Sequence, residues 1–325
     1  PIGNSVWQTQ SIDSAGWNAS LVSDLYSYLD SKNTKAFIVL KNGKIVLEKY
    51  FGTFTVDSLW YWASAGKTAT ALLTGIAQQE GLLDINQKTS DYIGTGWTSL
   101  PLNKENLITV RHQLTMTTGL DDEVADDDCT LPSCLIYKAD AGTRWAYHNA
   151  PYTLMDSVLQ SATGMMLNAY FRQKIRDRIG MNGAWIRNGY NNVYFSNARS
   201  MARFGLLMLN KANWNGTAIL QDSSYFNAQT NSSQTINLSY GYLTWLNGKT
   251  SHMLPTLQNV FSGYMIPNAP ADLYAALGKN DQKIYVVPSQ KLVVIRMGNA
   301  AGNVQLALSS FDNELWGKLK AMIGY

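Results

Sequence analysis

The sequence carries little charge, and that charge is not concentrated in any one stretch. Only 15% of the 325 residues are charged, and 26 basic residues stand against 23 acidic ones, for a formal net charge of +3. No run of lysine and arginine could follow a phosphate backbone, so we expect no nucleic-acid partner. No apolar stretch approaches the roughly 18 to 20 residues that a membrane helix needs, so we expect no membrane span.

Cysteine is almost absent, and the two cysteines lie close together. Cys129 and Cys134 stand in the polar stretch DDDCTLPSC, with a proline between them. We predict a disulfide between them, which suits an oxidising compartment, and two free thiols in a surface loop are the alternative. A metal site would need two further ligands, so we expect neither a metal nor any other cofactor.

The N-terminal sequence PIGNSVWQTQ lacks the basic-then-apolar pattern of a signal peptide, and it begins with proline rather than methionine. We therefore expect a leader that has already been removed. Together with the predicted disulfide, this favours a periplasmic or secreted protein.

Hydrophobic residues make up 46% of the chain, enough for one large core or two small ones. The stretch WNASLVSDLYSYLD places its apolar residues on one helical face. In AFIVLKNGKIVLEKYFG, the pair Asn42-Gly43 predicts a hairpin. A helix is predicted from Ser64 to Gln79, with Gly81 as its C-terminal stop, and helix-like segments continue to about Leu209.

The composition changes after residue 216. YGYLTWLNG, DLYAALGKNDQKIYVV and KLVVIRMGN favour strands, and a closing helix follows with Phe311, Leu315, Leu319 and Ile323 at core spacing. Strands at both ends of the chain predict an α+β fold with one antiparallel sheet flanked by terminal helices. We expect a single unit over 1–325, with an α/β subdomain from 1–75 and 215–325 and a mainly helical one from 76–214.

Chemistry is first suggested by YWASAGKTAT, in which Ser64 precedes Lys67 by three residues. Residues three apart share a helical face, so the lysine amine can reach the serine hydroxyl. A serine needs a neighbouring base to become a nucleophile, and a lysine can be that base once burial lowers its pKa. The surrounding LWYWASAGKTATALLTG contains no acid that would hold the lysine charged. The alternative is a helix-capping serine followed by a solvated lysine.

A second motif, in GTRWAYHNAPYTLMDSVLQ, places Tyr147 and Asn149 on either side of His148. With it, the chain resembles the serine hydrolases of the β-lactamase, penicillin-binding protein and family VIII esterase group, including class C β-lactamases and 6-aminohexanoate-dimer hydrolases. VLKNGKIVLEKYFG, ITVRHQLTMTTGLDD, DRIGMNGAW and YFSNARSMARFGLLMLNKANWNG match further segments of that group. The resemblance covers about residues 36 to 300 and implies the β-lactamase/transpeptidase-like fold.

The resemblance also implies roles for these residues. Ser64 would be the acylated nucleophile, Lys67 its base, and Tyr147 the phenol that relays protons to and from the leaving group. Asn149 would orient the substrate and the lysine. The backbone amide of Ser64 and one from the strand near Asp281 would form the oxyanion hole.

The group's third motif, a lysine or histidine followed by threonine or serine and then glycine, departs from the pattern. The GKT at 248–250 imitates it, but ALGKNDQKIYVVPSQKLVVIRMG fits the C-terminal hairpin better and places Lys279, Asn280 and Asp281 at the motif as substrate-binding residues. Asn280 replaces a hydroxyl and Asp281 a glycine. We expect the Asp281 charge to repel a substrate carboxylate, which disfavours β-lactams.

Other candidate sites are weaker. His148 could act as a base, but alternate residues of an extended loop point to opposite sides. A nucleophile elbow needs G-x-S-x-G, and Trp62 takes the place of its first glycine. A cluster of acidic residues could bind calcium but lacks the glycine and the distal glutamate of a loop site, so a solvated loop at the mouth of the cleft is expected. Its members are Asp121, Asp122, Glu123, Asp126, Asp127 and Asp128.

The sequence therefore predicts a metal-free serine hydrolase that cleaves a small ester or amide through an acyl-enzyme on Ser64. A D,D-peptidase or a β-lactamase is the first alternative. A sensor that is acylated but never turns over is the second. Trp60, Trp62, Trp145 and Trp245 could line the cleft, although most tryptophans pack in cores.

Overall fold

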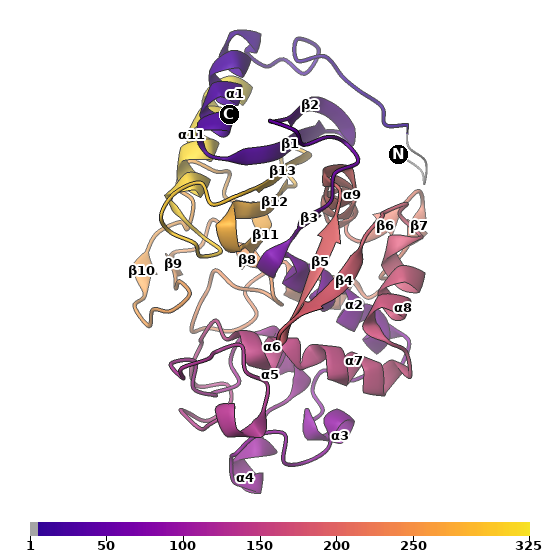
Figure 1. Ribbon diagram of the computed structural model, residues 1–325, viewed down its shortest axis with the longest axis vertical. Helices are drawn as coiled ribbons and strands as arrows, with labels where there is room; N and C mark the ends of the chain where they lie inside the picture. Colours follow the sequence, from indigo (N-terminus) through magenta and orange to yellow (C-terminus); the bar gives the residue numbers. More distant parts are fainter. Residues whose placement is uncertain (1–5) are drawn as a thin grey trace.

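A six-stranded antiparallel sheet joins the two ends of the chain in the computed structural model, which describes residues 6–325 (Figure 1). Strand β1 from the N-terminal part pairs with β13 from the C-terminal part, with Ile38 opposite Ile295. The predicted sheet built from both chain ends is confirmed. Its strands, in order across the sheet, are β2 (Lys44–Tyr50), β1 (Thr34–Lys41), β13 (Leu292–Gly298), β12 (Gln282–Val287), β11 (Tyr274–Gly278) and β8 (Trp245–Leu246).

The hairpin between β1 and β2 turns at Asn42 and Gly43, as predicted. Both residues have positive φ, 52° and 75°, which is the backbone that a tight two-residue hairpin requires and that asparagine and glycine adopt at low cost.

Helices cover both faces of the sheet. On one face lies α11 (Ser310–Ile323), where Tyr285 of β12 donates a hydrogen bond to Asp312 (2.6 Å). On the other lies α9 (Ala198–Leu209), packed so closely that a Cβ at Gly205 would meet Val293 at 2.5 Å. The alternation of side chains along each strand supplies an apolar surface for both helices. Beside α11 runs α1 (Val22–Ser31), which follows η1 (Ala19–Leu21) (Figure 1).

Helix α2 (Gly66–Gln79) is buried along most of its length, which its alanine, threonine and glycine residues permit. Gly75 lets the Tyr225 ring approach, since a Cβ there would lie 2.4 Å from it. Helices fill the part of the molecule that Figure 1 draws below the sheet. The remaining helices are η2 (Ala63–Ala65), α3 (Ser90–Ile93), α4 (Leu102–Glu105), α5 (Val110–Leu114), η3 (Pro132–Cys134), α6 (Asn149–Thr153), α7 (Met155–Thr163), α8 (Leu167–Phe171), the π-helical η4 (Arg172–Arg176), α10 (Ser223–Gln229) and η5 (Lys279–Asp281).

A second sheet interrupts the segment that was expected to be helical up to about residue 209. It has the order β3-β5-β4, and β4 and β5 form a hairpin that turns at Gly189 and Tyr190. Gly189, the first of the two turn residues, has a φ of 61°, and a glycine at that position is typical of a type II′ hairpin turn, so Gly189 was the signal for this turn. Its strands are β3 (Trp60–Tyr61), β4 (Ala184–Asn188) and β5 (Asn191–Ser196).

Two short hairpins complete the fold, β6 (Asn213–Trp214) with β7 (Thr217–Ala218) and β9 (Ser251–His252) with β10 (Phe261–Ser262). The mixture of helices and antiparallel sheets confirms the α+β class. The subdomain boundaries near residues 75 and 215 stay a prediction. In the described part of the chain, every helix is too short or too polar to cross a membrane.

Candidate active site

Ser64 lies in η2, at the point where strand β3 leads into helix α2. This turn is strained and firmly anchored. Ala63 has a φ of 48°, which is unusual for a residue with a side chain. The fully buried Trp62 donates a hydrogen bond to Ser196 (2.8 Å) and packs against Tyr194. The second sheet therefore holds the turn that presents the Ser64 hydroxyl.

Lys67 lies one helical turn after Ser64, and its amine is within hydrogen-bond distance of two partners. Nζ is 2.8 Å from Ser64 Oγ and 2.9 Å from Asn149 Oδ1. The residue is only 5% exposed, and burial lowers the pKa of its amine to about 7, although Asp128 and Asp127 act in the opposite direction. The amine can therefore be neutral near pH 7, which a base must be to accept a proton.

Tyr147 completes the group around the serine. Its phenol lies close enough to the Ser64 hydroxyl to interact with it, and its ring stacks on Trp245 with centroids 5.5 Å apart. Burial raises the pKa of this phenol, and the interaction with Ser64 only partly opposes the rise. At neutral pH, Tyr147 is thus a protonated phenol beside the Ser64 hydroxyl. The structure brings together four predicted residues, Ser64, Lys67, Tyr147 and Asn149.

His148 points away from this network. Its backbone is extended, with φ of −120° and ψ of 119°, so its side chain faces opposite to its two neighbours. It is 2% exposed, and neither ring nitrogen hydrogen-bonds to any residue that the structure describes. Burial lowers its pKa to about 4. The other two histidines bind elsewhere, His112 to Thr109 and His252 to the carbonyl of Gly263.

The end of strand β11 lies against the Ser64 turn. A Cβ at Gly278 would meet the Trp62 carbonyl oxygen at 2.4 Å and the Ala65 nitrogen at 3.0 Å. Strand β8 pairs with β11 only at Tyr274 and Ala275. On that side, no described strand pairs with 276–278, and this short edge of backbone is left beside the serine.

The third motif forms η5, directly after this edge. The Lys279 side chain is exposed, and Asn280 donates a hydrogen bond from Nδ2 to the Tyr61 hydroxyl (2.9 Å). Arg296 is buried and donates from Nη1 to the carbonyls of Asn280 and Asp281, both at 3.0 Å. The segment is therefore held rigidly next to β3 and the Ser64 turn.

Asp281 differs from the expectation that its charge faces a substrate. Its carboxylate is fully buried, accepting hydrogen bonds from the Ala301 amide (3.0 Å) and the Ser309 hydroxyl (2.7 Å) and pairing with Lys283 (3.2 Å). Burial alone would raise its pKa, but these partners hold it below its ordinary value. Asp281 thus links the sheet to the segment that leads into α11, and direct repulsion of a substrate carboxylate is not supported.

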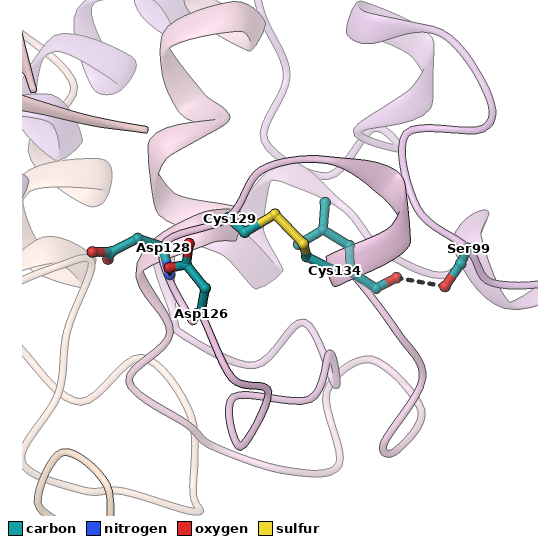
Figure 2. Close-up of a disulfide and its surroundings, with 6 residues drawn as sticks. Ser99, Asp126, Asp128, Cys129 and Cys134 are labelled. Carbon is teal, nitrogen blue, oxygen red and sulfur yellow. Dashed lines mark hydrogen bonds between the residues drawn. A yellow bond between two sulfur atoms is a disulfide. The ribbon is translucent and has the colours of Figure 1, made fainter. Parts of the chain in front are cut away.

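The predicted disulfide between Cys129 and Cys134 is present and closes a short loop. Figure 2 shows it between Asp126 and Asp128 on one side and Ser99 on the other, where Ser99 donates to the Leu135 carbonyl (3.1 Å). The acidic loop, residues 121–128, reaches the active site. The Asp127 carbonyl accepts a hydrogen bond from the Ala150 amide of α6 (3.0 Å).

Three carboxylates of the acidic loop crowd together, with oxygens of Asp126, Asp127 and Asp128 within 4.8 Å of one another. Burial and the neighbouring Asp128 raise the pKa of Asp127. Asp128 accepts a hydrogen bond from Asn191 of the β4–β5 hairpin (2.8 Å). Exposed acidic groups often lie this close without a metal ion, so we describe them as a source of negative potential near Lys67.

The sequence did not single out Tyr152, which lies with its ring centre 4.3 Å from Lys67 Nζ. Its spacing of three residues from Asn149 on a predicted helix was the available signal. Conversely, Trp62, Trp145 and Trp245 are at most 2% exposed, so they support the site from the core rather than line its cleft.

This arrangement matches a known family. A model of the family described as Beta-lactamase matches residues 32–314. The chain belongs to the beta-lactamase family. Its match covers both motifs and the C-terminal hairpin, and it confirms the resemblance and the β-lactamase/transpeptidase-like fold. The comparison with curated proteins found no significant match.

Solved structures show the same fold at low identity. A candidate 6-aminohexanoate-dimer hydrolase from Bacillus anthracis is 18% identical, with a TM-score of 0.73 over 98% of this chain and 89% of that one. A candidate beta-lactamase from Bacteroides dorei is 15% identical, with a TM-score of 0.75 over 95% and 100%. A penicillin-binding protein homologue from Caulobacter crescentus is 14% identical, with a TM-score of 0.71 over 93% and 96%. The beta-lactamase family fold supports serine hydrolase activity in general.

Proposed function

We propose that this protein hydrolyses an ester or an amide of a small molecule through an acyl-enzyme on Ser64. The observation that carries the proposal is the 2.8 Å contact between Lys67 Nζ and Ser64 Oγ, made by a lysine that is almost fully buried. A serine hydroxyl hardly ionises at neutral pH, and this neighbour supplies the base that it needs.

In the acylation step, Ser64 Oγ attacks the carbonyl carbon of the substrate while its proton passes to the Lys67 amine. The carbonyl oxygen becomes an oxyanion, which the backbone amide of Ser64 and an amide at the 276–278 edge of β11 would stabilise. When the tetrahedral intermediate collapses, the bond to the alcohol or amine leaving group breaks. Tyr147, a neutral phenol next to Ser64, delivers the proton that this leaving group requires.

Deacylation reverses the roles with water as the nucleophile. Lys67 and Tyr147 act together as the base that takes a proton from the water. The water then attacks the acyl carbon, the acid is released, and a proton returns to Ser64 Oγ. Asn149, which accepts a hydrogen bond from Lys67, orients the amine in both steps. All of these steps use side chains and backbone amides of the protein itself, and they need neither a metal nor a cofactor.

The third motif is the reason for proposing an ester or amide substrate rather than a β-lactam or a D,D-peptide. Asn280 takes the place of the motif's hydroxyl, and its amide already donates to Tyr61. An anionic substrate would therefore find Lys279 without the hydroxyl that the motif itself supplies. The name of the Bacillus anthracis structure, a dimer hydrolase of 6-aminohexanoate, describes cleavage of an amide. Because Lys279 is exposed and can still attract a carboxylate, a β-lactam or a D,D-peptide is the alternative substrate.

The test is a screen of the purified protein against p-nitrophenyl esters, short amide oligomers and a chromogenic cephalosporin, with Ser64→Ala as the control. We expect the wild-type protein to turn over an ester or amide and to be labelled by a fluorophosphonate. Ser64→Ala should show neither. Labelling of Ser64→Ala at the unchanged rate would place the nucleophile elsewhere. Efficient cephalosporin hydrolysis would favour the β-lactamase alternative, and a stoichiometric burst without turnover would favour the sensor.

A periplasmic or secreted location is part of the proposal. The disulfide supports it, because such bonds persist in oxidising compartments and are rare in the cytosol. Fractionation of the native host, followed by detection of the protein and of its thiol state, tests it.

A further inference from the structure

Tyr152 lies on the same side of Lys67 as Asn149 and contacts the lysine from the same short helix. Asn149 and Tyr152 are three residues apart on α6, and Lys67 and Thr70 are three apart on α2. Asn149 accepts from Lys67 (2.9 Å), and the Tyr152 hydroxyl hydrogen-bonds with Thr70 Oγ1 (3.2 Å). The two helices are thus joined by two hydrogen bonds one helical turn apart. The bond between Tyr152 and Thr70 holds the Tyr152 ring against the Lys67 amine.

The Tyr152 ring gives the Lys67 amine a contact in addition to its two hydrogen bonds. Lys67 Nζ has two hydrogen-bond partners, Ser64 and Asn149, and its distance to the Tyr152 ring centre is 4.3 Å. The Tyr147 ring lies further away, at 5.1 Å. As the base, the neutral amine accepts the hydrogen of the Ser64 hydroxyl and donates one of its own two hydrogens to Asn149, so one uncharged N–H is left over. The ammonium donates to both Ser64 and Asn149, and its remaining N–H now carries positive charge, which in a buried site needs a partner other than water.

We propose that Tyr152 is a positioning residue whose ring stabilises the ammonium that Lys67 forms when it takes the proton of Ser64. The proposal rests on the proposed function, since it assigns a partner to the base of that reaction. The negative face of an aromatic ring attracts a cation most strongly where water is excluded, and Tyr152 is 7% exposed. The ring thereby favours the charged state that appears during acylation.

Several charged or phenolic groups act on this pair, and each must stay constant in a test. Asp127 and Asp128 of the acidic loop act on Lys67, and Asp156 of α7 acts on Tyr152. The phenols of Tyr147 and Tyr240 are also close. None of them is altered by a substitution at position 152, so a comparison among variants of that position isolates the ring.

The experiment follows the rate of Ser64 labelling by a fluorophosphonate between pH 5 and 9, which reports acylation without knowledge of the substrate. In the wild type, the labelling rate should fall at low pH as Lys67 becomes protonated, and we call this fall the acid limb. Tyr152→Phe keeps the ring and should keep the acid limb at the same pH. Tyr152→Leu removes the ring, disfavours the ammonium and should move the acid limb down by about one pH unit, with a lower plateau. A purely structural role would lower the plateau without moving the limb.

A graded series guards against misfolding of the Leu variant. Phenylalanine with increasing ring fluorination at position 152 keeps the shape of the side chain while it weakens the negative face. The acid limb should move down stepwise along the series. If the wild-type protein is labelled normally but the acid limb of the series stays in place or moves to higher pH, the role of Tyr152 is overturned while the proposed function stands. A wild-type protein labelled no faster than Ser64→Ala would instead contradict the proposed function.

Discussion

The amine of Lys67 lies 2.8 Å from the hydroxyl of Ser64, and burial lowers the pKa of that amine to about 7. Because only the neutral amine can accept the serine proton, the reactive fraction falls below this pKa. We expect kcat/KM to decrease about tenfold per pH unit below pH 7 and to level off above it. A pH profile of ester or amide hydrolysis measures this, and a flat profile between pH 5 and 9 would contradict it. Lys67→Arg, permanently charged, should be inactive throughout.

The acidic loop should tune this same profile. Asp128 acts to raise the pKa of Lys67, against the effect of burial. In Asp128→Asn, which can still accept the hydrogen bond from Asn191, the charge is lost and the pKa of Lys67 falls further. We expect the acid limb to move to lower pH while the stability changes little. An exposed loop acid such as Glu123 provides the matched control, because Glu123→Gln should leave the profile in place.

Tyr147→Phe tests the proton relay. The substitution keeps the ring that stacks on Trp245 and removes only the hydroxyl that lies beside Ser64. Loss of a general acid–base group typically lowers the rate by about 10² to 10⁴-fold, so we expect kcat to fall in that range with KM and the melting temperature nearly unchanged. Steady-state kinetics and thermal unfolding decide it. Activity within threefold of the wild type would mean that another group protonates the leaving group.

Asp281→Asn should cost stability without changing substrate choice. The substitution removes one partner of the buried Lys283, which keeps Asp312 at 2.8 Å. Breaking a buried pair usually costs about 3 to 5 kcal/mol, and the remaining partner favours the lower end of that range. Urea unfolding measures the loss. A clear gain in cephalosporin hydrolysis relative to esters would instead restore a direct role of Asp281 at the substrate.

The disulfide should hold the acidic loop in place. Replacement of Cys129 and Cys134 by serine removes the constraint on a short loop, for which chain entropy predicts a loss of roughly 2 kcal/mol in unfolding free energy. Intact mass with and without reductant should differ by two hydrogen atoms in protein folded under oxidising conditions. Equal masses would remove the support for a location outside the cytoplasm.

Local patterns were enough to predict several parts of this protein. The positive φ values that Asn42 and Gly43 adopt readily determined the hairpin between β1 and β2. The apolar spacing of Phe311, Leu315 and Leu319 determined the closing helix. The three-residue spacing of Ser64 and Lys67 likewise determined that an amine and a hydroxyl share one helical face. Such features depend on neighbours within a few residues, so the sequence alone carries them.

Tertiary structure decided the rest, because it depends on segments far apart in the chain. The pKa of Lys67 follows from its burial against α6, opposed by the charges of the acidic loop, and no local spacing encodes either effect. Tyr152 meets the lysine only because α6 docks on α2. Asp281 faces the interior because η5 turns through two residues with left-handed backbone, at 280 and 281. Its carboxylate is held there by Lys283 of β12 and by Ser309, which directly precedes α11. An isolated motif names the residues of a site, but their charge states and directions arise from the packing around them.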